Sequence, residues 1–459
     1  MTVRSFLKLA LPFSFVVGII LAVGYLKKAL PILSGYGAKN LCSCVMVGLR
    51  TPQDVIDNEL ASFPLNLGDF TIDWTDSSAT GSVYGMAKRK AIYREGLGCT
   101  LISQTTEEEL RGQRFRKPKS PKVNQDTIPW PYGNQTDAMN DTGLDVVSLN
   151  QIIENAFEYP ESRRTRAILV VHQGQIIAEK YAEGFGRNSR QMGWSMTKSL
   201  TNAIVGKFVD EGRFRMESPA AIYEWKADER AEITLDNLMR MSSGLGWNEK
   251  YSGPSQATNM LFNSHQMGIF AAAAKLKDKP GDVFYYSSGT TNIISRIIRQ
   301  SSNQDEYYQY PYEALFHKIG MFSLVMEPDA SGTFVGSSYA YATARDWARF
   351  GLLYMNDGVW QGERLLPEGW VGYSTTVTKG AIRGEYGAHF WLNAGSPEDP
   401  SDRIYPSVPT DLYWADGFEG QNVFIIPSRN LVVVKLSQTT GDPLNDDQFL
   451  SDILAALPK

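Results

Sequence analysis

The chain has 459 residues, of which 43% are hydrophobic and 21% are charged, and its net charge is −5. This is the composition of a globular protein with one large domain or two smaller ones. The slight negative charge argues against a nucleic-acid partner, because nucleic-acid-binding proteins normally carry a basic face. The cysteines and histidines show no zinc-ligand spacing, so we expect neither a catalytic metal nor another cofactor.

The first 28 residues differ from the rest of the chain. They contain an uncharged run from residue 9 to residue 26 that is flanked by the basic residues Arg4, Lys8, Lys27 and Lys28. A run of about 18 apolar residues is long enough to cross a bilayer. A signal peptide cleaved near Ala22-Val23-Gly24 is the alternative. We favour an uncleaved single-pass anchor, with the rest of the chain on the exported side of the membrane.

Residues 29–110 are expected to form a small extension that contains β-strands. Residues 83–93 and 99–104 have strand character, with glycines between them. The three cysteines of the chain lie in this extension, at positions 42, 44 and 99. In an exported protein a Cys42–Cys99 or a Cys44–Cys99 disulfide is reasonable, and three buried free thiols are the alternative.

Residues 111–146 are predicted to be a charged linker. Basic residues at 111–122 are followed by a stretch rich in Pro, Asn and Asp, which breaks any regular pattern. The basic residues can touch anionic lipid, but a solvated linker is the simpler interpretation.

Residues 147–459 show the pattern of one folded domain. A β-hairpin is predicted at residues 167–181 and a helix-rich region up to about residue 375. The elements predicted after it are strands at 387–392, 422–426 and 431–436, and a helix at 446–457. Strands at both ends with helices between them predict an α+β fold, in which an antiparallel sheet is flanked by helices and carries an all-helical lobe.

The segment Gly193-Trp194-Ser195-Met196-Thr197-Lys198 carries the first candidate chemistry. Apolar residues recur after it at helical spacing, which predicts a helix with Ser195 at or next to its N-terminus. Lys198 then lies on the same side of this helix. A serine hydroxyl needs a base to become a nucleophile, and a lysine amine can be that base if its pKa is lowered. The alternative is a capping serine with a solvated lysine.

Two further segments have candidate roles. Tyr286-Ser287-Ser288 is expected in a loop directly before a helix, where the phenol can pass a proton between Ser195 and a leaving group. The alternative is a packed ring followed by two turn serines.

Ala415-Asp416-Gly417 precedes a predicted strand, and a strand edge next to glycine can present backbone N–H groups to a substrate carbonyl. On its own this segment would be an ordinary strand entry.

Taken in this order, the three motifs resemble those of the serine β-lactamase and penicillin-binding-protein superfamily. The chain looks most like the class C-like serine hydrolases, which include esterases, D-aminopeptidases and 6-aminohexanoate-dimer hydrolases. Residues 239–251, 350–371 and 417–421 also resemble that group. The resemblance covers about residues 147–459.

The resemblance implies a cofactor-free serine hydrolase with Ser195 as the acylated nucleophile, Lys198 as its base and Tyr286 as the proton relay. The backbone N–H groups of Ser195 and Phe418 would form the oxyanion hole. The implied substrate-binding residues are Tyr251, Ser288 and Gly417.

Two departures from the family pattern affect the expected substrate. Family members that bind penicillins usually have Asn where this chain has Ser288, and Lys-Thr-Gly where it has Ala415-Asp416-Gly417. The missing lysine removes the usual partner of a substrate carboxylate, and Asp416 would repel one. We therefore expect hydrolysis of esters or of linear or cyclic amides in a small molecule, rather than β-lactamase or D-Ala-D-Ala carboxypeptidase activity.

Two other function classes were weighed. An α/β-hydrolase would carry Gly-x-Ser-x-Gly, but Thr197 stands in place of the second glycine. A catalytically silent binding or sensor protein on this fold would be expected to lack the serine, the lysine or the tyrosine, and this chain has all three.

Overall fold

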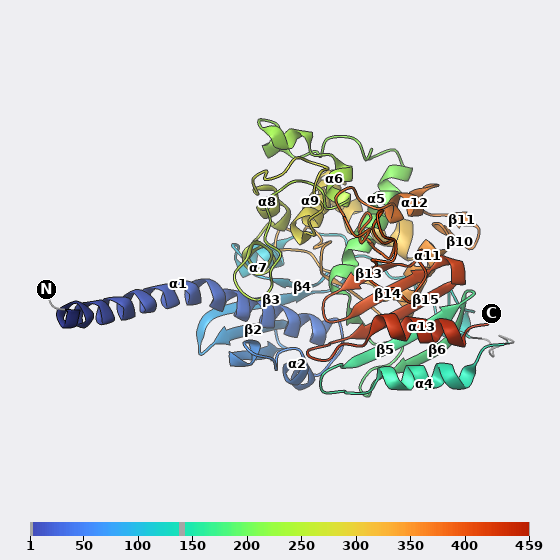
Figure 1. The fold of residues 1–459 in the computed structure, drawn as a ribbon, viewed down its shortest axis with the longest axis horizontal. Helices are drawn as coiled ribbons and strands as arrows, with labels where there is room; N and C mark the ends of the chain where they lie inside the picture. The colour runs from blue at the N-terminus through green and yellow to red at the C-terminus, as the bar shows by residue number, and fades with distance from the viewer. Residues whose placement is uncertain (1–2, 137–142, 459) are drawn as a thin grey trace.

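A computed structural model describes residues 3–136 and 143–458 of the chain. Its first element is one long helix, α1 (Val3–Met46), which projects from the body of the protein and ends inside it (Figure 1). Apolar side chains are exposed on α1 between Val16 and Leu26, whereas most side chains from Ile32 onward are buried. The residues of α1 from Val16 are apolar enough, and the helix long enough, to cross a membrane. The helix continues without a break across residue 28.

An antiparallel sheet packs against the inner half of α1 and confirms the strand character predicted for this region. Its strands lie in the order β1 (Gly68–Asp73), β2 (Ser78–Val83), β3 (Met86–Arg94) and β4 (Gly98–Leu101). Two short helices adjoin it, α2 (Pro52–Asn58) and α3 (Glu107–Gly112).

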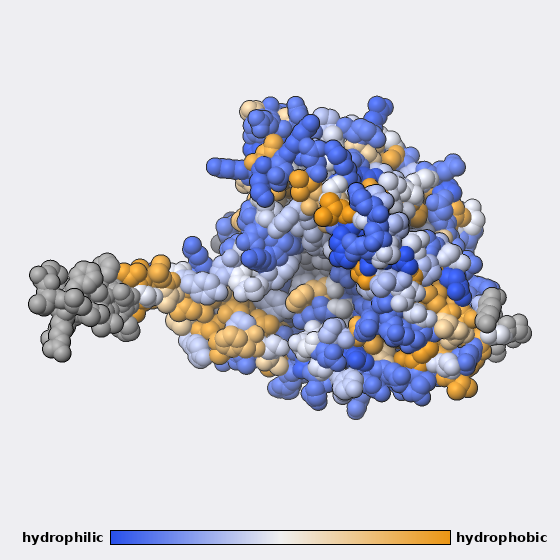
Figure 2. Space-filling view, in the orientation of Figure 1, coloured by the Kyte–Doolittle hydropathy of each residue, from blue (hydrophilic) through white to orange (hydrophobic). Residues whose placement is uncertain are grey.

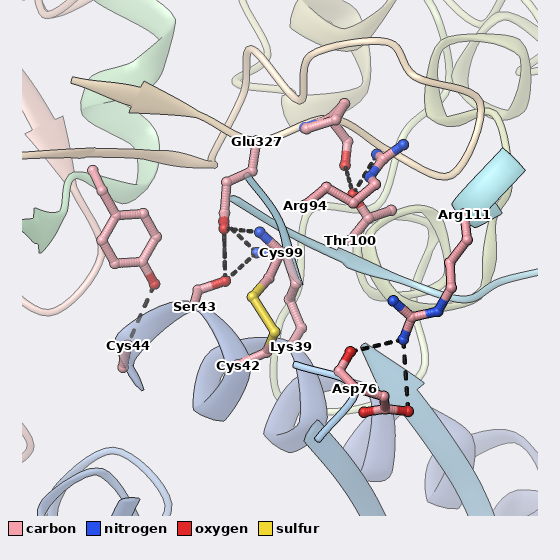
Figure 3. The surroundings of a disulfide bond; sticks show 12 residues. Lys39, Cys42, Ser43, Cys44, Asp76, Arg94, Cys99, Thr100, Arg111 and Glu327 are labelled. Atoms are coloured by element: carbon pink, nitrogen blue, oxygen red, sulfur yellow. Dashed lines mark hydrogen bonds and ion pairs between the residues drawn. A yellow bond between two sulfur atoms is a disulfide. The ribbon is translucent and has the colours of Figure 1, made fainter. Parts of the chain in front are cut away.

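A disulfide and a buried ion pair hold α1 in place (Figure 3). Cys42 on α1 is bonded to Cys99 on β4, which confirms one of the two predicted pairings, and Cys44 is a buried free thiol. Next to the disulfide, the Lys39 ammonium pairs with the buried Glu327 carboxylate, which also accepts the Cys99 N–H at 2.6 Å. Because Glu327 belongs to the region 147–459, these contacts join α1, the first sheet and that region.

The central sheet of the region 147–459 is antiparallel, with the strand order β12-β13-β14-β15-β5-β6 in the described residues. Its strands are β5 (Thr165–His172), β6 (Gln175–Tyr181), β12 (Trp391–Leu392), β13 (Tyr413–Gly417), β14 (Gln421–Ile426) and β15 (Leu431–Ser437). The pairing of β15 with β5 confirms that segments far apart in the sequence form one sheet. One face is covered by α4 (Val146–Ala156) and α13 (Asp446–Ala456), and the other by α11 (Ala344–Met355).

The chain between β6 and β12 is mainly helical and forms a lobe beside the sheet, as predicted for an α+β fold (Figure 1). Besides α11, its helices are α5 (Thr197–Asp210), α6 (Leu235–Met239), α7 (Gln256–Asn263), α8 (Met267–Ala272), α9 (Ser288–Gln300), α10 (Gln304–Tyr307) and α12 (Trp370–Thr375).

The helix-rich region also contains strands that the sequence did not predict. They are β7 (Gln191–Met192), β8 (Val325–Met326), β9 (Ala340–Ala342), β10 (Val359–Trp360) and β11 (Glu363–Arg364). Strands of two or three residues are too short to show an alternating apolar pattern. The strand predicted at 387–392 is correspondingly reduced to β12, because His389 has a φ of +59°, which interrupts an extended backbone.

The predicted linker is packed against the body where the structure describes it. Arg349 of α11 donates hydrogen bonds to the backbone carbonyls of Pro131 and Gly133, both at 2.6 Å. Residues 137–142 lie outside the described residues. The domain divisions predicted at residues 28, 110 and 146 stay predictions.

The buried ion pair of α1 leads to a stability prediction. Lys39→Met should lower the free energy of unfolding by about 3–5 kcal/mol, because the Glu327 carboxylate then stays buried without its cation. Urea unfolding of the detergent-solubilised full chain measures this change. The matched control is Lys180→Met, which breaks a partly exposed ion pair with Glu154 and should change stability by less than about 1 kcal/mol. Equal losses in the two variants would contradict the role given to Lys39.

Candidate active site

Ser195 lies in a single 3₁₀ turn, Trp194–Met196, that leads directly into α5. This confirms its predicted place next to a helix N-terminus. Trp194 has a φ of +46°, a strained conformation of the kind that clusters at functional sites. Gly193 is required here because a Cβ atom on it would lie 2.4 Å from the Trp347 ring.

Lys198 is buried, with 2% of its side chain exposed, so the alternative of a solvated lysine is wrong. Its Nζ donates hydrogen bonds to Ser195 Oγ at 2.9 Å, to Ser288 Oγ at 3.0 Å and to the Ser337 carbonyl at 2.9 Å. A protonated amine has three donors, and these three acceptors use all of them. The amine is therefore held in one position next to the serine hydroxyl.

The surroundings of Lys198 make its uncharged form easier to reach than that of a lysine in water. Burial lowers the pKa of Lys198 to about 8, although the carboxylates of Glu249 and Asp416 act in the opposite direction. Burial also raises the pKa of Asp416 to about 6, against the effect of the Lys435 ammonium. An amine with a pKa near 8 is partly uncharged at neutral pH, which is what a base for Ser195 requires.

Tyr286 lies in the loop before α9, as predicted, and faces Ser195 and Lys198. The Tyr286 ring stacks on Trp391 with 5.5 Å between ring centroids, and the Lys198 Nζ lies 4.8 Å from the centroid of the Tyr286 ring. Burial raises the pKa of Tyr286 well above its usual value, and the Ser195 side chain acts in the opposite direction. The phenol is therefore protonated near neutral pH and lies beside the serine.

Glu249 is the member of the site that the sequence analysis missed. Its carboxylate accepts hydrogen bonds from the Ser288 hydroxyl, from the Ser288 N–H at 3.0 Å, from the Tyr251 hydroxyl at 2.7 Å and from the Trp247 indole. Since Ser288 also bonds Lys198, one hydroxyl links the carboxylate to the amine. Its position two residues before Tyr251, in a segment that resembles the family, was the available signal.

The remaining predicted residues surround the same point. Tyr251 Oη lies 3.1 Å from Ser288 Oγ, and its ring stacks on Phe418 with centroids 6.4 Å apart. At the end of β13, a Cβ atom on Gly417 would lie 2.2 Å from the Gly193 carbonyl oxygen, so this strand edge touches the segment that holds the nucleophile. The structure thus brings together all the predicted site residues, while their catalytic roles stay predictions.

The arrangement is suited to acyl transfer. It joins a hydroxyl, a buried amine and a protonated phenol, which are the groups needed to activate a nucleophile and to protonate a leaving group. In residues 3–136 and 143–458, no three or more His, Cys, Asp or Glu side chains are grouped so that they could hold a metal ion.

Solved structures with a similar fold carry related names. A protein from Bacillus anthracis, provisionally named a 6-aminohexanoate-dimer hydrolase, matches with a TM-score of 0.57 and 23% identity over 75% of this chain and 93% of its own. A penicillin-binding protein homologue from Caulobacter crescentus matches with a TM-score of 0.54 and 15% identity over 70% of this chain and 100% of its own. At these identities the likeness concerns the fold.

Sequence comparison gives the family. The 6-aminohexanoate-dimer hydrolase of Paenarthrobacter ureafaciens is 26% identical over 310 residues, which are 60% of this chain and 73% of the relative. The model of the β-lactamase family matches residues 152–456, which include the predicted site residues. The chain therefore belongs to the β-lactamase family of serine hydrolases.

Proposed function

We propose that the protein is a membrane-anchored hydrolase that cleaves esters or small amides through an acyl-enzyme on Ser195. The observation that carries this proposal is the 2.9 Å hydrogen bond between Ser195 Oγ and the buried amine of Lys198. The lowered pKa of Lys198 and the position of Tyr286 beside both groups support it.

In the proposed reaction, Ser195 Oγ bonds to the substrate carbonyl carbon as its proton passes to Lys198. Tyr286 relays a proton to the leaving oxygen or nitrogen when the C–O or C–N bond breaks. Water then attacks the acyl-enzyme with the same groups, which releases a carboxylic acid. The N–H groups of Ser195 and Phe418 would stabilise the oxyanion, and the close approach of Gly417 to Gly193 supports this role.

The charges around Lys198 favour neutral or positively charged substrates. Glu249 and Asp416 both act on its amine, so the site carries negative charge that would repel a substrate carboxylate. The relative from Paenarthrobacter ureafaciens, whose name is that of an amide hydrolase, supports amides as one substrate class.

We propose α1 as a single-pass anchor that leaves the catalytic region on the exported side. The exposed apolar side chains between Val16 and Leu26 support the anchor. The Cys42–Cys99 disulfide supports the exported side, because disulfides persist in oxidising compartments.

Replacing the proposed catalytic groups should stop the reaction at different steps. Ser195→Ala should abolish labelling by a fluorophosphonate probe, because the nucleophilic oxygen is gone. Tyr286→Phe should lower kcat for a p-nitrophenyl ester by roughly 10²–10⁴, the usual effect of losing an acid–base group. The neighbouring, half-exposed Tyr285 provides the control, since Tyr285→Phe should leave kcat unchanged. An unchanged kcat in Tyr286→Phe would remove the phenol from the mechanism.

The pH profile tests the link between Glu249 and Lys198. In the unmodified protein, kcat/KM should rise with pH up to about 8, as Lys198 loses its proton. Glu249 raises the pKa of Lys198, so Glu249→Gln should move this limb to lower pH, by about one unit. Glu229→Gln, the same change at a surface position, is the control and should leave the limb in place. A limb that stays at the same pH in Glu249→Gln would contradict the link.

Substrate charge separates the proposed activity from that of a β-lactamase. The kcat/KM for p-nitrophenyl butanoate should exceed that for nitrocefin at least about tenfold, because the nitrocefin carboxylate meets the negative charge of the site. Parallel assays of the two substrates measure the ratio. The reverse order would favour the β-lactamase alternative.

A further inference from the structure

The apolar part of α1 and the candidate active site are parts of one rigid arrangement. The exposed apolar residues before Lys27 and the buried residues after Ile32 belong to a single unbroken helix. The inner half of that helix is fixed by the Cys42–Cys99 disulfide and by the Lys39–Glu327 ion pair (Figure 3). If the apolar part lies in a bilayer, the position of the site above that bilayer is therefore set by the helix.

Two tyrosines of α1, at different positions along the helix, contact residues at or near the site. The ring of Tyr36 stacks on Trp194, the residue before the nucleophile, with centroids 6.1 Å apart. Closer to the projecting end, a Cβ atom on Gly253 would lie 3.0 Å from Tyr25 Oη, so Tyr25 packs against the loop that carries Tyr251. At 1.5 Å per residue, Tyr25 and Tyr36 are about 16 Å apart along α1. The point where α1 contacts Trp194, the residue before the nucleophile, thus lies about that far along the helix from the end of the apolar run.

Exposed aromatic rings lie between the end of the apolar run and the site. Tyr25 is 54% exposed, Tyr251 45% and Phe418 52%. Tyr251 stacks on Phe418, which meets the ring of Trp194 edge-on at 5.8 Å. We call Tyr25, Tyr251 and Phe418 the aromatic path. Tyr251 and Phe418 are in ring contact, and Tyr25 joins them through Gly253 of the loop that carries Tyr251. Exposed apolar side chains that gather in this way mark a surface that contacts an apolar partner, and tyrosine is common where lipid meets water.

A second apolar feature lies beside α1. The disulfide fixes β4 next to Cys42 of α1, and the end of β3 that pairs with β4 lies there too. Gly81 on β2 packs against the Ser34 carbonyl, eight residues earlier on the helix. The turn between β2 and β3 therefore lies toward the projecting part of α1, and its exposed side chains include Tyr84 and Met86. Figure 2 shows hydrophobic surface on α1 and on the part of the body next to it. This face of the body is suited to contact with a membrane surface.

We propose that the substrate is a membrane amphiphile, an ester or amide whose apolar chain extends from the bilayer along the aromatic path to Ser195. This proposal rests on the proposed hydrolase function and on α1 as the anchor. The chemistry is unchanged: the ester C–O or amide C–N bond breaks, the acyl group passes to Ser195 Oγ and then to water, and the alcohol or amine leaves with a proton. What the path adds is selection for substrates that reach the site from the lipid phase.

The test separates the height of the site above the membrane from its chemistry. Ten Gly and Ser residues are inserted after Lys28, where α1 leaves the apolar run, and the full chain is reconstituted in phosphatidylcholine vesicles. The insertion keeps the anchor but frees the site from its fixed height. Hydrolysis of p-nitrophenyl hexadecanoate held in the vesicles should fall about tenfold or more, because the substrate is no longer presented to the site. Hydrolysis of dissolved p-nitrophenyl butanoate should be unchanged.

The control inserts the same ten residues after Glu398, in an exposed loop between β12 and β13, and should change neither rate. Equal hexadecanoate rates for the two insertions would overturn the membrane-amphiphile proposal. The proposal would also be overturned if intact mass showed that the unmodified protein recovered from membranes lacks residues 1–24, because the anchor would then be absent. Failure of the hydrolase proposal looks different: Ser195→Ala would then hydrolyse butanoate as fast as the unmodified protein.

Discussion

The site depends on one interaction, the contact between the Ser195 hydroxyl and an amine that has lost its water of hydration. Burying a charged ammonium is unfavourable, so the Lys198 amine gives up its proton more readily than a lysine in water. Its acceptors come from the turn before α5, from the start of α9 and from the Ser337 carbonyl. The base is therefore available only when these three segments are packed together, and all three belong to the helical lobe.

Two carboxylates near Lys198 act on the pKa of its amine. Glu249 reaches Lys198 through the Ser288 hydroxyl, and Asp416 lies on the strand edge across the site. Both raise the pKa that burial lowers, so the value near 8 is a balance between desolvation and two carboxylates. In the comparison of motifs made above, Ala415 stands where the family pattern has a lysine, and the acidic Asp416 follows it. The strand edge next to Lys198 therefore carries an acidic side chain and lacks that basic one.

The helix α1 has two roles that are physically inseparable. Its inner half forms part of the site wall, because Tyr36 supports Trp194, and its outer half presents apolar side chains that water does not solvate well. The disulfide and the buried ion pair fix the inner half to the body, and the helix continues from there without a break into the outer half. If the outer half is the anchor that we propose, a continuous helix couples membrane attachment to the position of the site, which a short flexible connection would not do.

The sequence by itself determined the features that depend on neighbours in the chain. The three-residue spacing of Ser195 and Lys198, the tyrosine ahead of a helix and the apolar run at residues 9–26 could all be recognised, because helix periodicity and segment length are local properties. The order of these motifs was enough to predict the family, and the strands predicted at both ends of the region 147–459 were enough to predict the α+β fold. Very short strands such as β7 could not be predicted, since two residues form a strand only when a distant partner supplies the hydrogen bonds.

Tertiary structure decided what depends on contacts between distant segments. Whether Lys198 is buried or solvated, and whether Cys42 or Cys44 pairs with Cys99, follows from which side chains meet across more than 50 residues of sequence. Glu249 looks like any surface glutamate until the loop that carries it folds onto Ser288. The physical reason is that the fold sets both distance and access to water: a disulfide needs two Cα atoms about 6 Å apart, as Cys42 and Cys99 are, and the Lys198 amine is desolvated by side chains from distant segments.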